Sequence, residues 1–159
     1  TIAAVVSDVP GAQVLDRAAA ATIPTKVIEF NQPRAVWDSE LLEFVASVKP
    51  DLVVSVGFMR ILSADFVSKF KVINSHPALL PNFPGTHAVR DALAAKAKQT
   101  GCTVHWVDAG VDTGQIIAQV AVDVLPNDDE ASLHERIKIV ERKLIVETIK
   151  SLESQIERS

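Results

Sequence analysis

The sequence predicts an α/β fold with a Rossmann-like, mostly parallel sheet, helices on both faces and an antiparallel edge near the C-terminal part. Apolar runs of strand length alternate with segments of helical periodicity, and the joints between them are short. Such strand–helix–strand units imply right-handed crossovers and parallel pairing. Toward the C-terminus, apolar and polar residues alternate instead, which is typical of a half-exposed edge strand.

The first third of the chain reads as strand, helix, strand, helix, strand. The predicted elements are a buried strand Ile2–Val6, a helix Val14–Ala21, a strand Lys26–Phe30, a helix carrying Trp37 to Val48 that Pro50 stops, and a strand Leu52–Val56. The last strand is too apolar to have a wet face, so we expect the sheet to be covered on both sides there.

The remaining elements follow from the same periodicities. Ser63 is the predicted N-cap of a short helix that runs through Lys69. The others are a strand Val72–Ser75, a helix from Ala88 to about Lys98 in a region that Gly101 ends, strands Cys102–Val107 and Ile116–Val124, and a helix from Glu130 to about Leu152 with a frayed tail to Ser159. Along Cys102–Val107 the alternation puts one set of side chains on each face: Thr103, His105 and Val107 on one, and Cys102, Val104 and Trp106 on the other.

Composition bounds the class of protein. The chain has 159 residues, of which 48% are hydrophobic, so it can bury one sizeable core and we expect a single domain over 1–159. The net charge of −4 and the dispersed basic residues argue against nucleic-acid binding. No apolar run approaches the length of a membrane span. Cys102 is the single cysteine, which fits a reducing cytoplasm.

Residues 72–87 are the most informative stretch. A short apolar strand places Asn74 and His76 two residues apart, so both side chains lie on the same face. Directly afterwards three prolines and Gly85 forbid helix and ordinary strand, which predicts a rigid irregular loop at the strand end. Sites in open α/β sheets form at such carboxyl ends.

An amide beside an imidazole suits attack on a carbonyl. Asn74 can donate to an oxygen that gains negative charge, and His76 can donate or accept a proton near neutral pH. Asp112, in the glycine-containing loop 108–114, is the best candidate for a third group that orients His76. Aspartates are also common in turns for local reasons, so a purely structural role of that loop stays open.

Four segments carry a resemblance to a known family. They are Gly57-Phe58-Met59-Arg60-Ile61-Leu62, Asn74-Ser75-His76-Pro77-Ala78-Leu79-Leu80-Pro81, Phe83-Pro84-Gly85-Thr86-His87 and Val111-Asp112-Thr113-Gly114-Gln115-Ile116-Ile117. In this order and spacing they resemble the glycinamide ribonucleotide transformylases of purine biosynthesis. These enzymes transfer a formyl group from 10-formyltetrahydrofolate to a primary amine through a tetrahedral intermediate. The resemblance extends from Thr1 to about Leu152.

The resemblance implies a role for each matching residue. The catalytic residues would be Asn74, His76 and Asp112. Residues that would bind the formyl-folate co-substrate are Met59, Arg60, Ile61, Leu62, Asp108, Val111 and Asp112. Those that would bind the nucleotide substrate are Pro77, Gly85, Lys138 and Glu141. Without the resemblance, Met59, Ile61 and Leu62 read as ordinary core residues, and Lys138 and Glu141 as a solvated ion pair on a helix.

The resemblance also implies a first strand and a glycine- and serine-rich phosphate loop ahead of Thr1. The sequence contains neither, so we expect it to be incomplete at its N-terminus. It contains no His, Asp or Glu cluster with ligand spacing, so we expect no metal. The predicted partners are two small molecules, the ribonucleotide and the formyl-folate, with the protein a monomer or homodimer.

Several alternatives remain open. The chain could be another formyl-folate enzyme, such as formyltetrahydrofolate hydrolase, methionyl-tRNA formyltransferase or a sugar-amine formyltransferase. It could be a folate-binding module without chemistry. A nicotinamide-dependent dehydrogenase is disfavoured because no Gly-x-Gly-x-x-Gly follows a strand. His105 is a second candidate to face the site, His87 reads equally well as an exposed helix-start residue, and Cys102 reads as a small buried hydrophobe.

Overall fold

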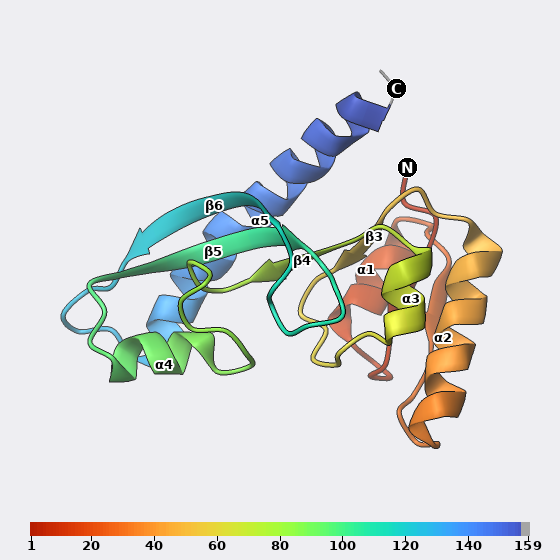
Figure 1. The fold of residues 1–159 in the computed structure, drawn as a ribbon, viewed down its shortest axis with the longest axis horizontal. Coiled ribbons are helices and arrows are strands. Elements are labelled where there is room, and N and C mark those ends of the chain that lie inside the picture. Colours follow the sequence, from red (N-terminus) through yellow and green to blue (C-terminus); the bar gives the residue numbers. More distant parts are fainter. Residues whose placement is uncertain (157–159) are drawn as a thin grey trace. The chain divides into compact units, whose positions relative to one another are not determined.

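The computed structural model describes residues 1–156, which form two compact units. The first unit is Thr1–Asp51 and the second begins at Leu52. Each contains both strands and helices, as Figure 1 shows along the chain.

The first unit is a strand–helix–strand–helix segment. Its elements are β1 (Val5–Ser7), α1 (Gln13–Ala20), β2 (Thr25–Val27) and α2 (Arg34–Val48). β1 and β2 pair in parallel, so α1 is the crossover between them. On α2, Trp37 is buried and its indole N–H donates to the Ile28 carbonyl at 2.9 Å, which ties the start of α2 to the chain that leaves β2.

The second unit contains a mixed four-stranded sheet in the order β3-β4-β5-β6. β3 and β4 are parallel, while β4–β5 and β5–β6 are antiparallel. Its elements are β3 (Val53–Ser55), α3 (Ala64–Lys69), β4 (Val72–His76), α4 (Ala88–Ala94), β5 (Gln99–Trp106), β6 (Ile116–Asp123) and α5 (Glu130–Ile156).

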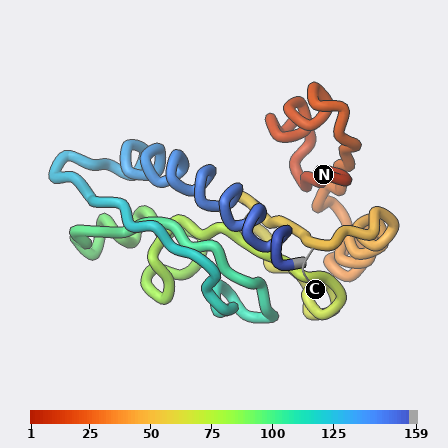
Figure 2. Tube along the Cα trace, turned by 90° about the horizontal axis from the view of Figure 1, so that it is seen from above, coloured from red at the N-terminus to blue at the C-terminus, as the bar shows by residue number. Residues whose placement is uncertain are grey.

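The core of the second unit lies between this sheet and α5. Figure 2 shows α5 running along one side of the strands, and it packs mainly on β5 and β6. Every third or fourth residue of α5 faces the sheet, the stripe expected of an amphipathic helix. The buried core residues are Ile73, Val89, Cys102, Val104, Val122, Leu133, Ile137, Leu144, Ile145 and Leu152.

Most predicted elements are confirmed, including the α/β class with a parallel part and an antiparallel C-terminal part. The Ser63 cap is also confirmed, because its hydroxyl accepts from the Phe66 N–H at the start of α3. The alternation predicted for Cys102–Val107 holds, since Cys102 and Val104 join the core while Thr103 and His105 point away from it.

Three predicted strands are shorter than expected, and two of them are also less buried. The strand predicted over Ile2–Val6 begins only at Val5, and Ile2 is 62% exposed. The strand predicted to be covered on both sides at Leu52–Val56 is β3, where Val54 is 38% exposed. Among the described residues β3 pairs only with β4. The prediction failed because an apolar run does not indicate how many strands lie beside it. The Lys26–Phe30 strand is likewise reduced to Thr25–Val27.

The region before β5 also departs from expectation. The helix predicted to reach Lys98 ends at Ala94, and β5 begins at Gln99. Gly101 lies inside β5 rather than ending the region. A Cβ there would collide with the Val120 carbonyl of β6 and with the Leu79 side chain, so glycine allows the close approach of β6.

The last helix is longer than expected. α5 continues past Leu152 to Ile156. The end of the predicted frayed tail, 157–159, lies outside the described residues.

Candidate active site

Strand β4 brings the amide and the imidazole to the same face, as the period-2 rule predicts. His76 is 4% exposed and its Nε2 lies 2.8 Å from the Phe83 carbonyl oxygen. A carbonyl can only accept, so this nitrogen carries the proton and donates. The bond ties His76 to the proline-rich loop 77–87, which is irregular as predicted.

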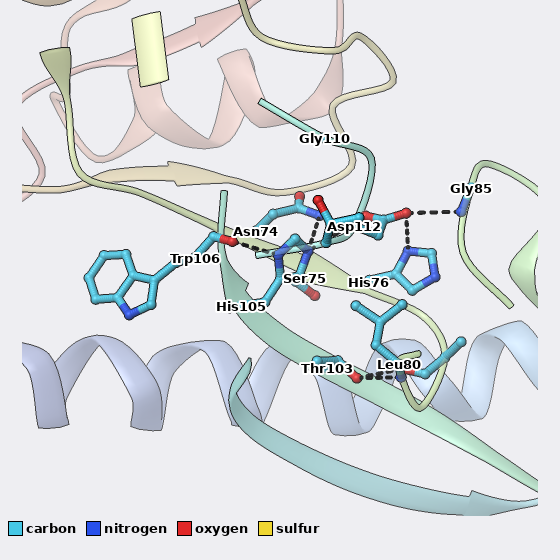
Figure 3. A network of polar contacts seen from close by, with 12 residues as sticks. Asn74, Ser75, His76, Leu80, Gly85, Thr103, His105, Trp106, Gly110 and Asp112 are labelled. Carbon is cyan, nitrogen blue, oxygen red and sulfur yellow. Dashed lines mark hydrogen bonds and ion pairs between the residues drawn. The ribbon is translucent and has the colours of Figure 1, made fainter. Parts of the chain in front are cut away.

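Asp112 lies between the strand and that loop. Its Oδ2 is 3.5 Å from His76 Nδ1 and accepts a 2.9 Å hydrogen bond from the Gly85 N–H. Figure 3 shows the carboxylate between these two partners. The residue adopts a left-handed backbone conformation with φ 54°, a region that Asp and Asn enter more readily than most residues. The predicted orienting role of Asp112 toward His76 therefore has the geometry it needs.

His105 completes the cluster. Its Nδ1 donates to the Trp106 carbonyl at 2.9 Å, and its Nε2 lies 3.3 Å from Asn74 Nδ2 and 3.5 Å from Asp112 Oδ1. Asn74 and His105 are cross-strand partners in the β4–β5 ladder, which explains their contact. Asp112 thus contacts both imidazoles, one with each carboxylate oxygen.

A buried network fixes the loop that follows β4. The Thr103 hydroxyl of β5 donates to the Ala78 carbonyl at 2.7 Å and accepts from the Leu80 N–H at 3.1 Å. From β6, the Gln119 amide donates to the Leu80 carbonyl and to the Thr103 hydroxyl, each at 2.9 Å. Sequence reasoning placed Thr103 on the correct face but gave no signal for Gln119.

A cavity of about 520 Å³ lies at the carboxyl end of β4. Every residue predicted for the site lines it. The lining includes Asn74, His76 and Asp112, together with Met59, Arg60, Ile61, Leu62, Asp108, Val111, Pro77, Gly85, Lys138 and Glu141. His87 and His105 line it as well, and α5 adds His134 and Arg142, which sequence reasoning missed. The sequence did contain one signal for them: each lies four residues from Lys138, so all three side chains share a face of α5.

The ion pair expected between Lys138 and Glu141 is not formed. Lys138 Nζ lies 3.0 Å from Glu135 Oε1 instead, and the Glu141 carboxylate accepts a hydrogen bond from the Ser75 hydroxyl. Both partners are three residues from Lys138, so spacing alone could not choose between them. The contact with β4 draws Glu141 toward the sheet.

Two further groups have displaced pKa values with local causes. Hydrogen bonds from the Thr113 hydroxyl and the Gly110 N–H lower the pKa of Asp108. The same two bonds stabilise the turn that Asp108 begins. Burial, and secondarily the negative charge of Glu141, raises the pKa of the Cys102 thiol to about 11. The thiol therefore stays protonated near neutral pH, in agreement with a packing role.

Comparison with known proteins fits this geometry. Residues 1–149 match the sequence model of the formyl transferase family. The chain belongs to the formyl transferase family. Within the described residues no helix is long and apolar enough to cross a membrane.

Similar members of the formyl transferase family include curated phosphoribosylglycinamide formyltransferases. The protein of that name from two Mycobacterium tuberculosis strains is 52% identical over 139 residues, which is 85% of this chain and 65% of the relative. The chain thus spans about two thirds of the length of these relatives. The trifunctional purine biosynthetic protein adenosine-3 of Drosophila melanogaster is 49% identical over 137 residues, 84% of this chain and 10% of that protein.

Solved structures in the family share the fold. The phosphoribosylglycinamide formyltransferase of Bacillus halodurans superimposes with a TM-score of 0.92 at 34% identity, covering 98% of this chain and 82% of its own. The enzyme of the same name from Streptococcus pneumoniae gives 0.89 at 38% identity, covering 94% and 86%.

Proposed function

We propose that the protein transfers a formyl group from 10-formyltetrahydrofolate to the amine of glycinamide ribonucleotide, a step of purine biosynthesis. The observation that carries the proposal is the meeting of Asn74, His76, His105 and Asp112 in one cavity. An amide, two imidazoles and a carboxylate at these distances provide oxyanion donors and a proton acceptor around one carbonyl. The relatives named phosphoribosylglycinamide formyltransferase support the choice of acceptor.

The apolar side chains at the cavity fit the formyl-folate. Met59, Ile61 and Val111 are 70%, 55% and 48% exposed although they are large and apolar. Exposed apolar side chains that line a cavity suit a flat aromatic ring, which would cover them. We assign the folate ring to this part of the cavity, with Arg60, Leu62 and Asp108 beside it.

The transfer would proceed by direct attack. The amine nitrogen bonds to the formyl carbon, and the carbonyl electron pair moves onto oxygen, where Asn74 Nδ2 and His76 donate. His76 Nε2–H is the ring donor that does not face Asp112, so we assign it to the oxyanion in exchange for its bond to the Phe83 carbonyl. The bond to the folate nitrogen then breaks, and a proton from the amine passes to that nitrogen with the Asp112 carboxylate as relay.

Each remaining residue has a place in this scheme. His105, whose Nδ1–H donates to the Trp106 carbonyl, accepts from the Asn74 amide through Nε2, and Asp112 orients His76. Pro77, Gly85, Lys138 and Glu141 are assigned to the nucleotide. The residues present supply all the groups the reaction needs, so the scheme contains no metal. We further propose a cytoplasmic protein, since the relatives act in purine biosynthesis and the buried Cys102 is a free thiol.

One assay separates this proposal from its rivals. Release of tetrahydrofolate from 10-formyltetrahydrofolate is followed with and without glycinamide ribonucleotide, and the nucleotide product is identified by mass. We expect turnover only with the nucleotide and a product heavier by one formyl group. Equal turnover without an amine, with release of formate, would identify a hydrolase. Calorimetric folate binding without turnover would identify a folate-binding module.

A further inference from the structure

Glu141 occupies an unusual position for a charged residue. It lies on the stripe of α5 that faces the sheet, four residues after Ile137 and immediately before the turn that carries Leu144 and Ile145. These three neighbours are 0%, 6% and 8% exposed. A carboxylate in such an apolar seam is costly unless its oxygens find partners.

The Ser75 hydroxyl is the partner that the structure provides. It donates to Glu141 Oε1, and Ser75 itself is 6% exposed. Among residues 1–156 no cationic side chain pairs with Glu141, because Lys138 turns to Glu135. One neutral donor on one oxygen is a sparse set for a carboxylate, which has about four acceptor sites.

The strand geometry explains why this partner lies here. Side chains alternate along β4, so Asn74 and His76 face the loops while Ser75 between them faces α5. Ser75 and Glu141 nevertheless line the same cavity as Asn74 and His76, because the cavity surrounds the end of the strand. Residues 74–76 of β4 therefore contribute side chains to two sides of the cavity, one toward the loops and one toward α5.

We infer that Ser75 is a positioning residue that sets the Glu141 carboxylate for the nucleotide substrate, an inference that rests on the proposed function. With Oε1 held by the strand, Oε2 is left to accept from hydroxyl or amine donors of the bound nucleotide. A carboxylate fixed in advance loses less side-chain freedom on binding, so the ligand binds more tightly. Ser75 touches no reacting atom and acts through Glu141.

A pair of nearly isosteric variants tests the hydroxyl. Ser75→Thr keeps the donor, whereas Ser75→Val has the same shape without it. We expect Ser75→Val to weaken glycinamide ribonucleotide binding by about 10-fold, as measured by calorimetry and as KM, with kcat and the KM for formyl-folate within about twofold of the wild type. Ser75→Thr should stay close to the wild type. Equal losses in the two variants would show that shape matters and not the hydroxyl, and would overturn the inference.

A double-mutant cycle tests whether the effect passes through Glu141. In a Glu141→Gln background, Ser75→Val should change nucleotide affinity by much less than it does alone, because the carboxylate it positions is gone. Additive effects would overturn the inference. The inactivity of the wild type with glycinamide ribonucleotide would contradict the proposed function instead.

Crystal structures of the two unliganded variants give an answer that does not depend on any substrate. Glu141 should keep its rotamer in Ser75→Thr and leave it in Ser75→Val. An unchanged rotamer in the valine variant would contradict the positioning role even if the protein had another activity.

Discussion

At the scale of single residues, the site depends on contacts between groups far apart in the sequence. Asn74, His76 and Asp112 were identifiable because strand spacing and a glycine-containing loop gave each a reason to face the cavity. His105 was a second candidate only, since a lone histidine in a strand is usually structural. In the structure His105 lies opposite Asn74 in the β4–β5 ladder, which brings its side chain to the site. The sequence of either strand alone does not predict how the two strands are aligned.

Replacing Asn74 tests the proposed oxyanion donor. Asn74→Ala should lower kcat by about 100- to 1000-fold while changing the KM values little, because the lost hydrogen bond forms mainly in the transition state. Steady-state kinetics measure it. Asn127→Ala, at an exposed position in the turn before α5, is the matched control and should leave kcat unchanged. A near-normal kcat in Asn74→Ala would remove Asn74 from the mechanism.

Cys102 provides a second test at this scale. The thiol is fully buried and its pKa is raised to about 11, so the native protein should not react with a thiol-selective disulfide reagent near neutral pH. After unfolding in guanidinium chloride, one thiol per chain should react. Fast reaction of the folded protein, followed by absorbance, would show that β5 opens readily or that the thiol is activated.

At the scale of elements, β5 is the strand on which the site is built. One face of it contributes Cys102 and Val104 to the core, and the other carries Thr103 and His105 to the loops. The sequence predicted this alternation. It did not predict that Thr103 and Gln119 would form hydrogen bonds to the proline-rich loop. A threonine or a glutamine in a strand gives no sequence pattern from which its hydrogen-bond partner could be predicted.

Two threonines of β5 give a matched comparison. Thr103→Val should lower the free energy of unfolding by about 1–3 kcal/mol, since it leaves the buried Ala78 carbonyl and Leu80 N–H without their partner. Thr100 is equally buried, but its hydroxyl has no partner among the described residues. Thr100→Val should therefore be neutral or stabilising. Urea denaturation of both variants measures the difference, and equal costs would contradict the role of the network.

At the scale of the whole molecule, the order of elements and the α/β class were predictable because periodicity and short joints are local properties. The lengths and burial of β1 and β3 were not, because they depend on how many strands lie beside them. The apolar stripe of α5 predicted the position of this long helix correctly. It did not predict that Glu141, on the same stripe, would contact Ser75 of β4.

Acid should destabilise the protein through the joint between β6 and α5. Hydrogen bonds from Arg136, 2.6 Å away, lower the pKa of Asp128. A carboxyl whose pKa is lower in the folded state stabilises that state above its unfolded value, near pH 4, and loses this contribution as the pH falls further. Urea midpoints should thus fall below about pH 4.

An Arg136→Met variant isolates that contribution. It should be less stable than the wild type at neutral pH, and the gap between the two urea midpoints should narrow in strong acid, where Asp128 is protonated in both. A gap that is independent of pH would mean that Arg136 acts through packing or through its hydrogen bond to the Asp123 carbonyl, and not through the charge of Asp128.

The positive φ of Asp112 limits how its carboxylate can be probed. Most L-amino acids at that position would incur a backbone penalty of about 1–2 kcal/mol on top of any lost chemistry, so an alanine there conflates two defects. Asparagine tolerates the same twist and keeps the side-chain outline, and glycine tolerates it without a side chain. Comparing those two replacements separates the charge from the shape, and a saturation library at this codon should retain folded protein best with Asp, Asn and Gly.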